Sequence, residues 1–248
     1  MFGMFKTFLC LGAGVLALTT TAHAFELHGS STLAKNIIEP NKAKIEAAAG
    51  VTLTVVMNGS GNGLKGLIAG KADMAMISAP LEVEAALTNA KAPGSLDVTG
   101  MQVFPVGKAT IAFVLHPQNP VTLTEDQVRT VFAGEATNWK ELGGADSPIL
   151  VVLEANGQGT RAVVESLFMK GKPFVANARV LQVLTQLTQV VSQAPNAISY
   201  GNSSSMKDLT LKVVPGVEVM QPLALVTKGA PTPEQKKLID AIVAAGGQ

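Results

Sequence analysis

The alternation of strand-like and helix-like segments constrains the fold of this chain more than any other feature of its sequence. Apolar, β-branched runs such as 51–57 and 149–153 are each followed by a helical pattern, and this order recurs along most of the chain. Such an order indicates helices packed on a mostly parallel sheet, so we predict an α/β architecture. The pattern alone does not fix the strand topology.

The expected elements follow from periodicity and from capping signals. Thr124 and Gln127 fit a capping box, and Thr232-Pro233-Glu234 combines a hydroxyl cap with proline at the first helical position. Strands are predicted over 51–57, 73–78, 103–116 (broken by Pro105 and Gly107), 149–153, 197–200, 209–214 and 217–228. Helices are predicted over 64–69, 81–90, 124–132, 160–169, 180–192 and from 232 onward.

Residues 1–24 have the pattern of a secretory signal peptide. Lys6 precedes an apolar core over 8–18, and the "AHA" that ends at Ala24 predicts cleavage between Ala24 and Phe25. An uncleaved anchor is the alternative, but the apolar run is short for a bilayer span. Cys10 follows Leu9, where a lipidated cysteine expects a small residue, so the exported chain keeps no cysteine. Export without disulfides suits a Gram-negative periplasm.

The charge balance excludes several classes of partner. The whole chain has 19 basic and 18 acidic residues, and removal of Lys6 with the leader leaves the two signs equal. No block of Lys and Arg appears, which argues against nucleic acid and membrane surfaces as partners. A bound anion would therefore be held by local geometry rather than by a global positive field.

No motif for catalysis or for a metal is present. His28 and His116 are the only histidines after residue 24, and neither sits in a motif that pairs it with Ser or Cys and an acid. No cluster with metal-ligand spacing appears. We therefore expect a protein that is not an enzyme and that has no metal site and no cofactor.

Three turns share one local pattern, in which glycine and hydroxyl residues follow a strand and open a helix. They are "HGSST" (28–32), "NGSGNG" (58–63) and "ANGQGTR" (155–161). The first N–H groups of a helix lack partners and its dipole favours negative charge, so each turn is a possible half-site for an oxyanion. Each alone also fits an ordinary N-cap, and their recurrence favours the anion. The G-x-G-x-x-G at 61–66 is weak evidence for a dinucleotide, because no acidic residue closes the next strand.

With their surroundings, these turns resemble the phosphate-binding proteins of bacterial phosphate ABC transporters, in the type II periplasmic solute-binding superfamily. The similar segments run from about Glu26 to the C-terminal helix. They are "GSSTL…EP", "NGSGNGLKGLIAGKADMAMISAPL", "LTEDQVRTVFAGEATNWKELGGADSPI", "GQGTR", "NAISYGNS" and "MQPLALVTK". The third of these is the most specific match.

The resemblance implies two α/β lobes joined by two crossover strands, with the ligand between them. Lobe one would comprise 25–105 and 217–248, and lobe two 106–216, with hinges at "FPVGKA" and "VMQPLA". It further implies a periplasmic protein that captures a tetrahedral oxyanion, most readily phosphate, and delivers it to an ABC permease in the inner membrane. We expect a monomer.

The resemblance also implies which residues bind the ligand. Arg161 would supply the one strong charge-assisted contact. Its alternative is a solvated first-turn residue, although a cation there opposes the helix dipole. The expected ligand-binding residues are Ser31, Thr32, Leu33, Ser60, Gly61, Ser78, Gln158, Gly159, Thr160 and Arg161.

The chain departs from the family pattern at four of its site positions. Ser78 stands where the family has an Asp that accepts a hydrogen bond from protonated phosphate, and a serine weakens that filter because it can also donate. Glu154 stands at a basic position, Asn156 at an Asp and Gln158 at a Ser. Glu154 would accept from a protonated anion, pair with Arg161, or point to solvent.

These departures keep two further hypotheses open. The ligand would be another oxyanion, such as sulfate, if the filter for protonated anions is lost. Alternatively, the pocket has drifted and the chain is an envelope or secreted interaction protein that keeps the fold alone.

Overall fold

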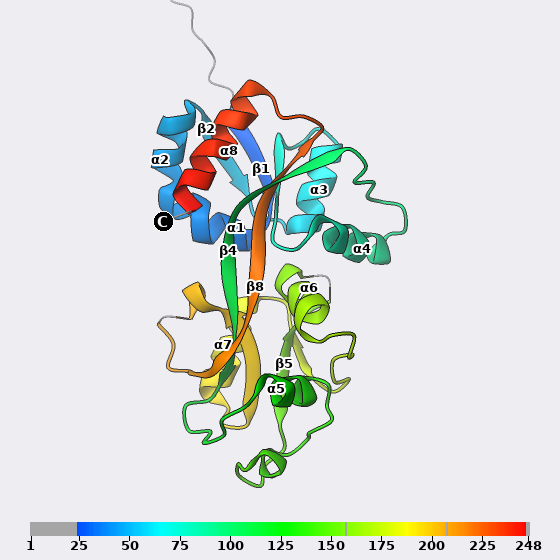
Figure 1. The fold of residues 1–248 in the computed structure, drawn as a ribbon, viewed down its shortest axis with the longest axis vertical. Coiled ribbons are helices and arrows are strands. Elements are labelled where there is room, and N and C mark those ends of the chain that lie inside the picture. The colour runs from blue at the N-terminus through cyan, green and yellow to red at the C-terminus, as the bar shows by residue number, and fades with distance from the viewer. Residues whose placement is uncertain (1–23, 157, 207, 247–248) are drawn as a thin grey trace, which may run out of the picture.

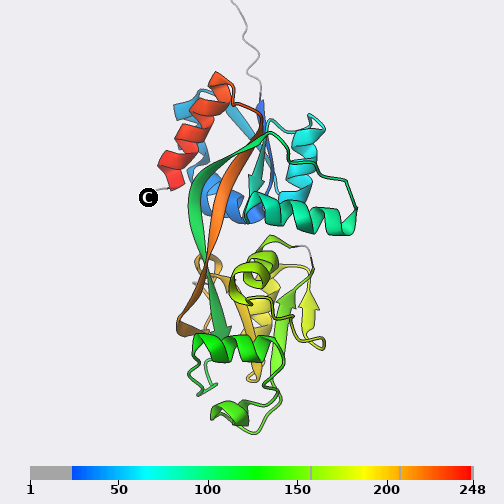
Figure 2. The same ribbon diagram turned by 45° about the vertical axis from the view of Figure 1, so that its right-hand side comes forward.

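The computed structural model describes residues 24–156, 158–206 and 208–246. Residues 1–23 of the predicted signal peptide, which include Lys6 and Cys10, lie outside the described residues. Figure 1 shows two bodies, one above the other, and Figure 2 shows them after a turn of 45°. Within the described residues, no helix combines the length and apolarity needed to cross a membrane.

The strands and helices alternate in the order that the sequence predicts. The strands are β1 (Ala24–Gly29), β2 (Thr52–Val56), β3 (Met74–Ile77), β4 (Met101–Leu115), β5 (Leu150–Glu154), β6 (Arg179–Leu181), β7 (Ala197–Asn202) and β8 (Lys212–Lys228). The α-helices are α1 (Ser31–Leu33), α2 (Glu39–Ala49), α3 (Ser60–Ile68), α4 (Leu81–Lys91), α5 (Glu125–Phe132), α6 (Gly159–Val163), α7 (Leu184–Gln193) and α8 (Pro233–Gly246). Short π- and 3₁₀-helical segments are η1 (Ala34–Ile38), η2 (Trp139–Leu142), η3 (Val164–Phe168) and η4 (Ser203–Ser205).

One eight-stranded sheet runs through both bodies, in the order β2-β1-β3-β8-β4-β7-β5-β6. The pairs β1–β2, β1–β3, β5–β6 and β5–β7 are parallel, whereas β3–β8, β4–β7 and β4–β8 are antiparallel. The predicted α/β class is therefore confirmed, but the sheet is mixed rather than mostly parallel. Each antiparallel pair involves β4 or β8, the two longest strands, which lie in the middle of the sheet.

Strands β4 and β8 run side by side from one body into the other (Figures 1 and 2). The segments expected as hinges face each other there: Pro105 pairs with Ala224, and Ala109 with Gln221. The register shifts between Pro105 and Gly107, where the sequence pattern of the strand is interrupted. The lobe bounds at 105–106 and 216–217 stay a prediction.

In the upper body the sheet is covered on both faces, and β3 shows how its sequence achieves this. Met74 and Met76 pack in one apolar cluster with residues of α2 and α8, whereas Ala75 and Ile77 pack in a second cluster with residues of α3 and α4. Successive side chains of a strand point to opposite faces, so an uninterrupted apolar run is what a strand buried on both sides requires.

The lower body has a separate core built around aromatic rings. Phe113 of β4 packs edge-on against Phe132 and Tyr200, with ring centroids 5.4 and 6.3 Å apart. Trp139 is 2% exposed, and its indole N–H donates to the carbonyl oxygen of Asn196 at 2.9 Å. Trp139 thus anchors the loop after α5 to the start of β7.

Two elements differ from the sequence-based expectation. The predicted helix over 180–192 starts later, because residues around Val180 form β6 and pair in parallel with β5; α7 begins only at Leu184. The predicted strands 209–214 and 217–228 form the single strand β8, which continues through Pro215 and Gly216. For β6, the parallel pairing with β5 supplies hydrogen-bond partners that local propensity does not reveal. In β8, the register with β4 shifts between the pairs Val114–Val213 and Ala112–Glu218, and this irregularity accommodates Pro215 and Gly216.

Candidate functional site

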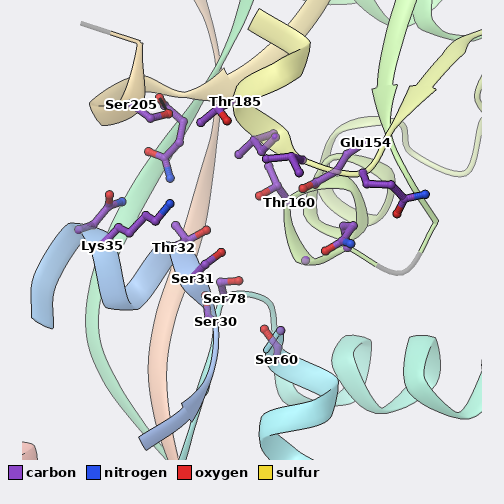
Figure 3. Close-up of a pocket in the computed structure, with 18 residues that line it drawn as sticks. Ser30, Ser31, Thr32, Lys35, Ser60, Ser78, Glu154, Thr160, Thr185 and Ser205 are labelled. Carbon is purple, nitrogen blue, oxygen red and sulfur yellow. Dashed lines mark hydrogen bonds between the residues drawn. The ribbon is translucent and has the colours of Figure 1, made fainter. Parts of the chain in front are cut away.

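A cavity of about 280 Å³ lies where the two bodies meet, between α1 and α3 of one and α6 and α7 of the other. In Figure 3, Ser30, Ser31, Thr32, Ser60 and Ser78 lie on one side of it. Glu154, Thr160, Thr185 and Ser205 lie on the other side. The lining residues are Ser30, Ser31, Thr32, Lys35, Asn36, Gly59, Ser60, Ser78, Glu154, Gln158, Gly159, Thr160, Gln182, Val183, Leu184, Thr185, Asn202 and Ser205.

The first turn presents its hydroxyl groups through a tight approach to β3. Gly29 has φ +135°, and a Cβ there would lie 2.2 Å from the carbonyl oxygen of Met76, so only glycine fits. Ser30 then caps α1 by accepting from the N–H of Leu33 at 3.2 Å. Leu33 is buried in the core and does not line the cavity, so the expected contribution of its N–H goes to the cap instead.

The second turn places Ser60 at the start of α3. Its side chain is 6% exposed and lines the cavity, and the preceding Gly59 provides no side-chain cap. The early N–H groups of α3 thus receive no side-chain acceptor from the N-cap residue. Gly61, which we expected to bind the ligand, lines a smaller adjoining cavity of about 140 Å³ instead.

The third turn brings α6 against the opposite body. Gln158, at the N-cap of α6, makes no side-chain capping bond, and Thr160 is 4% exposed and lines the cavity. A Cβ on Gly159 would lie 2.9 Å from Oγ of Ser78. Because real Cβ contacts are longer, glycine lets α6 approach Ser78 closely.

Glu154 points inward, so the solvent-facing alternative is wrong. Its side chain is 6% exposed and lines the cavity, and Oε2 accepts from the N–H of Arg161 at 3.2 Å. Burial raises the pKa of Glu154 to about 7, while the N–H and the charge of Arg161 oppose that rise. Asn156, by contrast, is exposed and does not line the cavity.

Arg161 differs from the expectation, because it does not line the cavity. Its guanidinium donates to the backbone oxygen of Glu154 at 2.8 Å and lies over the ring of Phe174, 4.8 Å from the centroid. The cation therefore braces the end of β5 behind the cavity wall. It contributes to the site by holding the backbone of Glu154.

Six polar residues that lie outside the three turns and that the sequence analysis did not single out also line the cavity. They are Lys35, Asn36, Gln182, Thr185, Asn202 and Ser205. Lys35 is the one Lys or Arg among the lining residues of the part of the chain that the structure describes. Hydroxyl and amide groups therefore dominate the wall.

The two bodies also touch at the end of the cavity formed by η1 and η4. There, Oγ of Ser204 donates to Oδ1 of Asn36 at 2.8 Å. Together with the approach of Gly159 to Ser78, this bond brings the walls into contact at two places. The structure therefore shows the two bodies closed on each other.

Glu84 on α4 is a second buried carboxyl group beside the site. It is 4% exposed and lines the smaller cavity, which shares Gly59, Ser60, Gln158 and Gly159 with the main one. Burial raises its pKa to about 6, against the lowering effect of hydrogen bonds from the Ser60 hydroxyl and from the backbone at Ser78 and Ala79. Glu84 lies in none of the three turns. Its position beside the site follows from the packing of α4 against α3, which the sequence does not show.

Chemically, the site offers neutral donors at three helix starts, with one exposed lysine and two buried carboxyl groups. Among the described residues, no group of three or more His, Cys, Asp and Glu side chains is placed to hold a metal ion. Helix starts with free N–H groups and nearby hydroxyls suit an oxyanion.

Comparisons with known proteins agree with this geometry. The chain is 26% identical over 183 residues to the phosphate-binding protein PstS of Bacillus subtilis, a match that covers 73% of this chain and 58% of that relative. It is 26% identical to a Clostridium perfringens protein solved with bound phosphate and described as a phosphate ABC transporter substrate-binding protein. That match has a TM-score of 0.73 and covers 89% of this chain and 93% of the other.

A third comparison supports the fold alone. An ABC-type phosphate transport receptor from Vibrio cholerae is 21% identical, with a TM-score of 0.68 and coverage of 90% of this chain and 94% of that one. The described architecture is thus the type II periplasmic-binding-protein fold. A family model for the PBP superfamily domain matches residues 17–246, so the chain belongs to the PBP superfamily, and its relatives there are of the PstS type.

Proposed function

We propose that this protein binds inorganic phosphate in the cavity between its two bodies and serves as the solute-binding component of an ABC uptake system. The convergence of three helix starts with buried hydroxyls on one cavity carries the proposal. The bound phosphate described for the Clostridium perfringens relative supports the choice of ligand.

The arrangement supports anion binding without a large positive charge. Backbone N–H groups at the starts of α3 and α6 and the hydroxyls of Ser78 and Thr160 can donate to an anion in the cavity, whereas the Ser60 hydroxyl already hydrogen-bonds to Glu84. A set of oriented dipoles replaces the hydration shell of an anion, and each bond to a charged ligand contributes about 1.5–3 kcal/mol.

Solute capture outside the inner membrane fits the other features of the chain. The PstS-type relatives are binding proteins rather than enzymes, and the predicted signal peptide would export the chain to the periplasm. A permease of the inner membrane would then receive the ligand when the two bodies open about β4 and β8.

A thermal-shift panel tests this function. The purified protein, dialysed free of anions, is heated with phosphate, arsenate, sulfate, molybdate or tungstate. Phosphate is expected to raise the Tm by mass action, because a ligand that binds only the folded state stabilises it. A Tm that none of the five anions changes would rule out an oxyanion-binding function.

A further inference from the structure

Glu84 has a carboxylate oxygen for which the fold supplies no partner. The side chain is 4% exposed, and its Oε1 atom makes no hydrogen bond within the described part of the chain. Buried polar atoms are almost always paired, because an unpaired one loses its hydration and gains nothing in return. This oxygen therefore requires a donor that arrives from outside the fold.

Glu84 lines the smaller cavity, not the main one, but the two cavities adjoin and share Gly59, Ser60, Gln158 and Gly159. A Cβ built on Gly159 would stand 2.9 Å from Oγ of Ser78, 3.6 Å from Oε1 of Glu84 and 3.7 Å from Oγ of Ser60. Both serines line the main cavity. Glu84 thus approaches the same point on α6 as two hydroxyl groups that line the main cavity.

The surroundings of Glu84 favour a role as acceptor at neutral pH. The Ser60 hydroxyl and the backbone at Ser78 and Ala79 stabilise the charged form, so its pKa rises only to about 6. Lys65 of α3 lines the smaller cavity with it. Across the main cavity, Glu154 has a pKa of about 7 and already accepts from the N–H of Arg161. Near neutral pH, a carboxyl group with a pKa of about 6 is mostly ionised, so Glu84 can accept a hydrogen bond.

We propose that Oε1 of Glu84 accepts a hydrogen bond from a protonated oxygen of the ligand and makes the site select anions that carry a proton. This inference rests on the proposed phosphate function. Hydrogen phosphate supplies the missing donor, whereas sulfate carries no proton at neutral pH and would set a bare oxygen against a buried carboxylate. Glu84, from α4, thereby provides the acceptor that Ser78, just after β3, does not guarantee.

The test is the ratio of phosphate affinity to sulfate affinity, measured by calorimetry at pH 7.5 for the wild type and for Glu84→Gln. The amide of glutamine can donate to sulfate, so the ratio of phosphate affinity to sulfate affinity should fall at least about tenfold in the variant. Glu82→Gln is the matched control, since Glu82 is exposed on the same helix and should leave the ratio unchanged.

The outcomes separate this inference from the proposed function. A variant that binds phosphate with an unchanged ratio overturns the role of Glu84 and leaves phosphate binding intact. A wild type that does not bind phosphate overturns both. If Glu84→Gln does not fold, Glu84→Asp replaces it: the shorter carboxylate should lower phosphate affinity about tenfold without admitting sulfate. Wild-type affinity in Glu84→Asp, or loss of the preference in Glu154→Gln alone, also overturns the inference.

Discussion

Gly159→Ala should weaken ligand binding without weakening the fold. Gly159 is the first residue of α6 and is not among the glycines with positive φ in the described chain, so its backbone accepts alanine. The added Cβ, however, would lie 2.9 Å from Oγ of Ser78 in the opposite body. The substitution therefore strains the contact between the bodies and leaves each core unchanged.

The magnitude follows from the cost of overpacking. An extra methyl group in a well-packed contact costs about 1–3 kcal/mol. Oγ of Ser78 ends a side chain that can rotate, so the lower end of this range applies. Because the cost falls on the closed arrangement that holds the ligand, the affinity for phosphate should drop roughly fivefold. The unliganded protein can relieve the strain by opening, so its free energy of unfolding should change by less than about 0.5 kcal/mol.

Calorimetry and urea denaturation of the same samples separate these two effects. The double variant Gly159→Ala/Ser78→Ala removes the oxygen that the new methyl group meets, so the second substitution should make the first much less harmful. A Kd for phosphate that Gly159→Ala leaves unchanged would refute the closed contact. A free energy of unfolding that falls together with the affinity would show that the residue acts on the fold instead.

Two other substitutions have distinct expected results. Glu154 has a folded-state pKa of about 7 against an ordinary 4.5, so it lowers the free energy of unfolding as the pH rises from 4.5 to 7, by about 3 kcal/mol at most. In urea denaturation at a series of pH values, Glu154→Gln should remove this decrease in the free energy of unfolding. The same pH dependence in the wild type and the variant would contradict a raised pKa for Glu154. Arg161→Ala should destabilise the fold by about 1–3 kcal/mol, because it leaves the Glu154 carbonyl without its donor. Arg161→Ala should raise the Kd for phosphate less than Gly159→Ala does. A larger rise would indicate that the guanidinium contacts the ligand directly.

Local sequence signals were sufficient for the helix starts and for the turns. The capping box of Thr124 and Gln127 is present as predicted, because its hydrogen bonds join residues only three positions apart. The turns that open α1, α3 and α6 also depend on nearby glycine and hydroxyl residues, and their side chains line one cavity. The order of strands and helices predicted the α/β class.

Side-chain directions that depend on distant partners were not predictable in this way. Arg161 follows the third turn, but Phe174 and the backbone of Glu154 hold its guanidinium behind the wall. Lys35 and Asn202 come from segments far apart in the chain, and only the closed bodies bring them to one cavity. Glu84 carries no motif, because its position depends on how α4 packs.

A crystal structure of the purified protein with phosphate tests the central claim most directly. We expect the anion between the starts of α3 and α6, with its oxygens about 2.5–3.2 Å from the hydroxyls of Ser78 and Thr160. Density for the anion elsewhere, or an empty cavity at a phosphate concentration that saturates binding in solution, would contradict the assignment of this site.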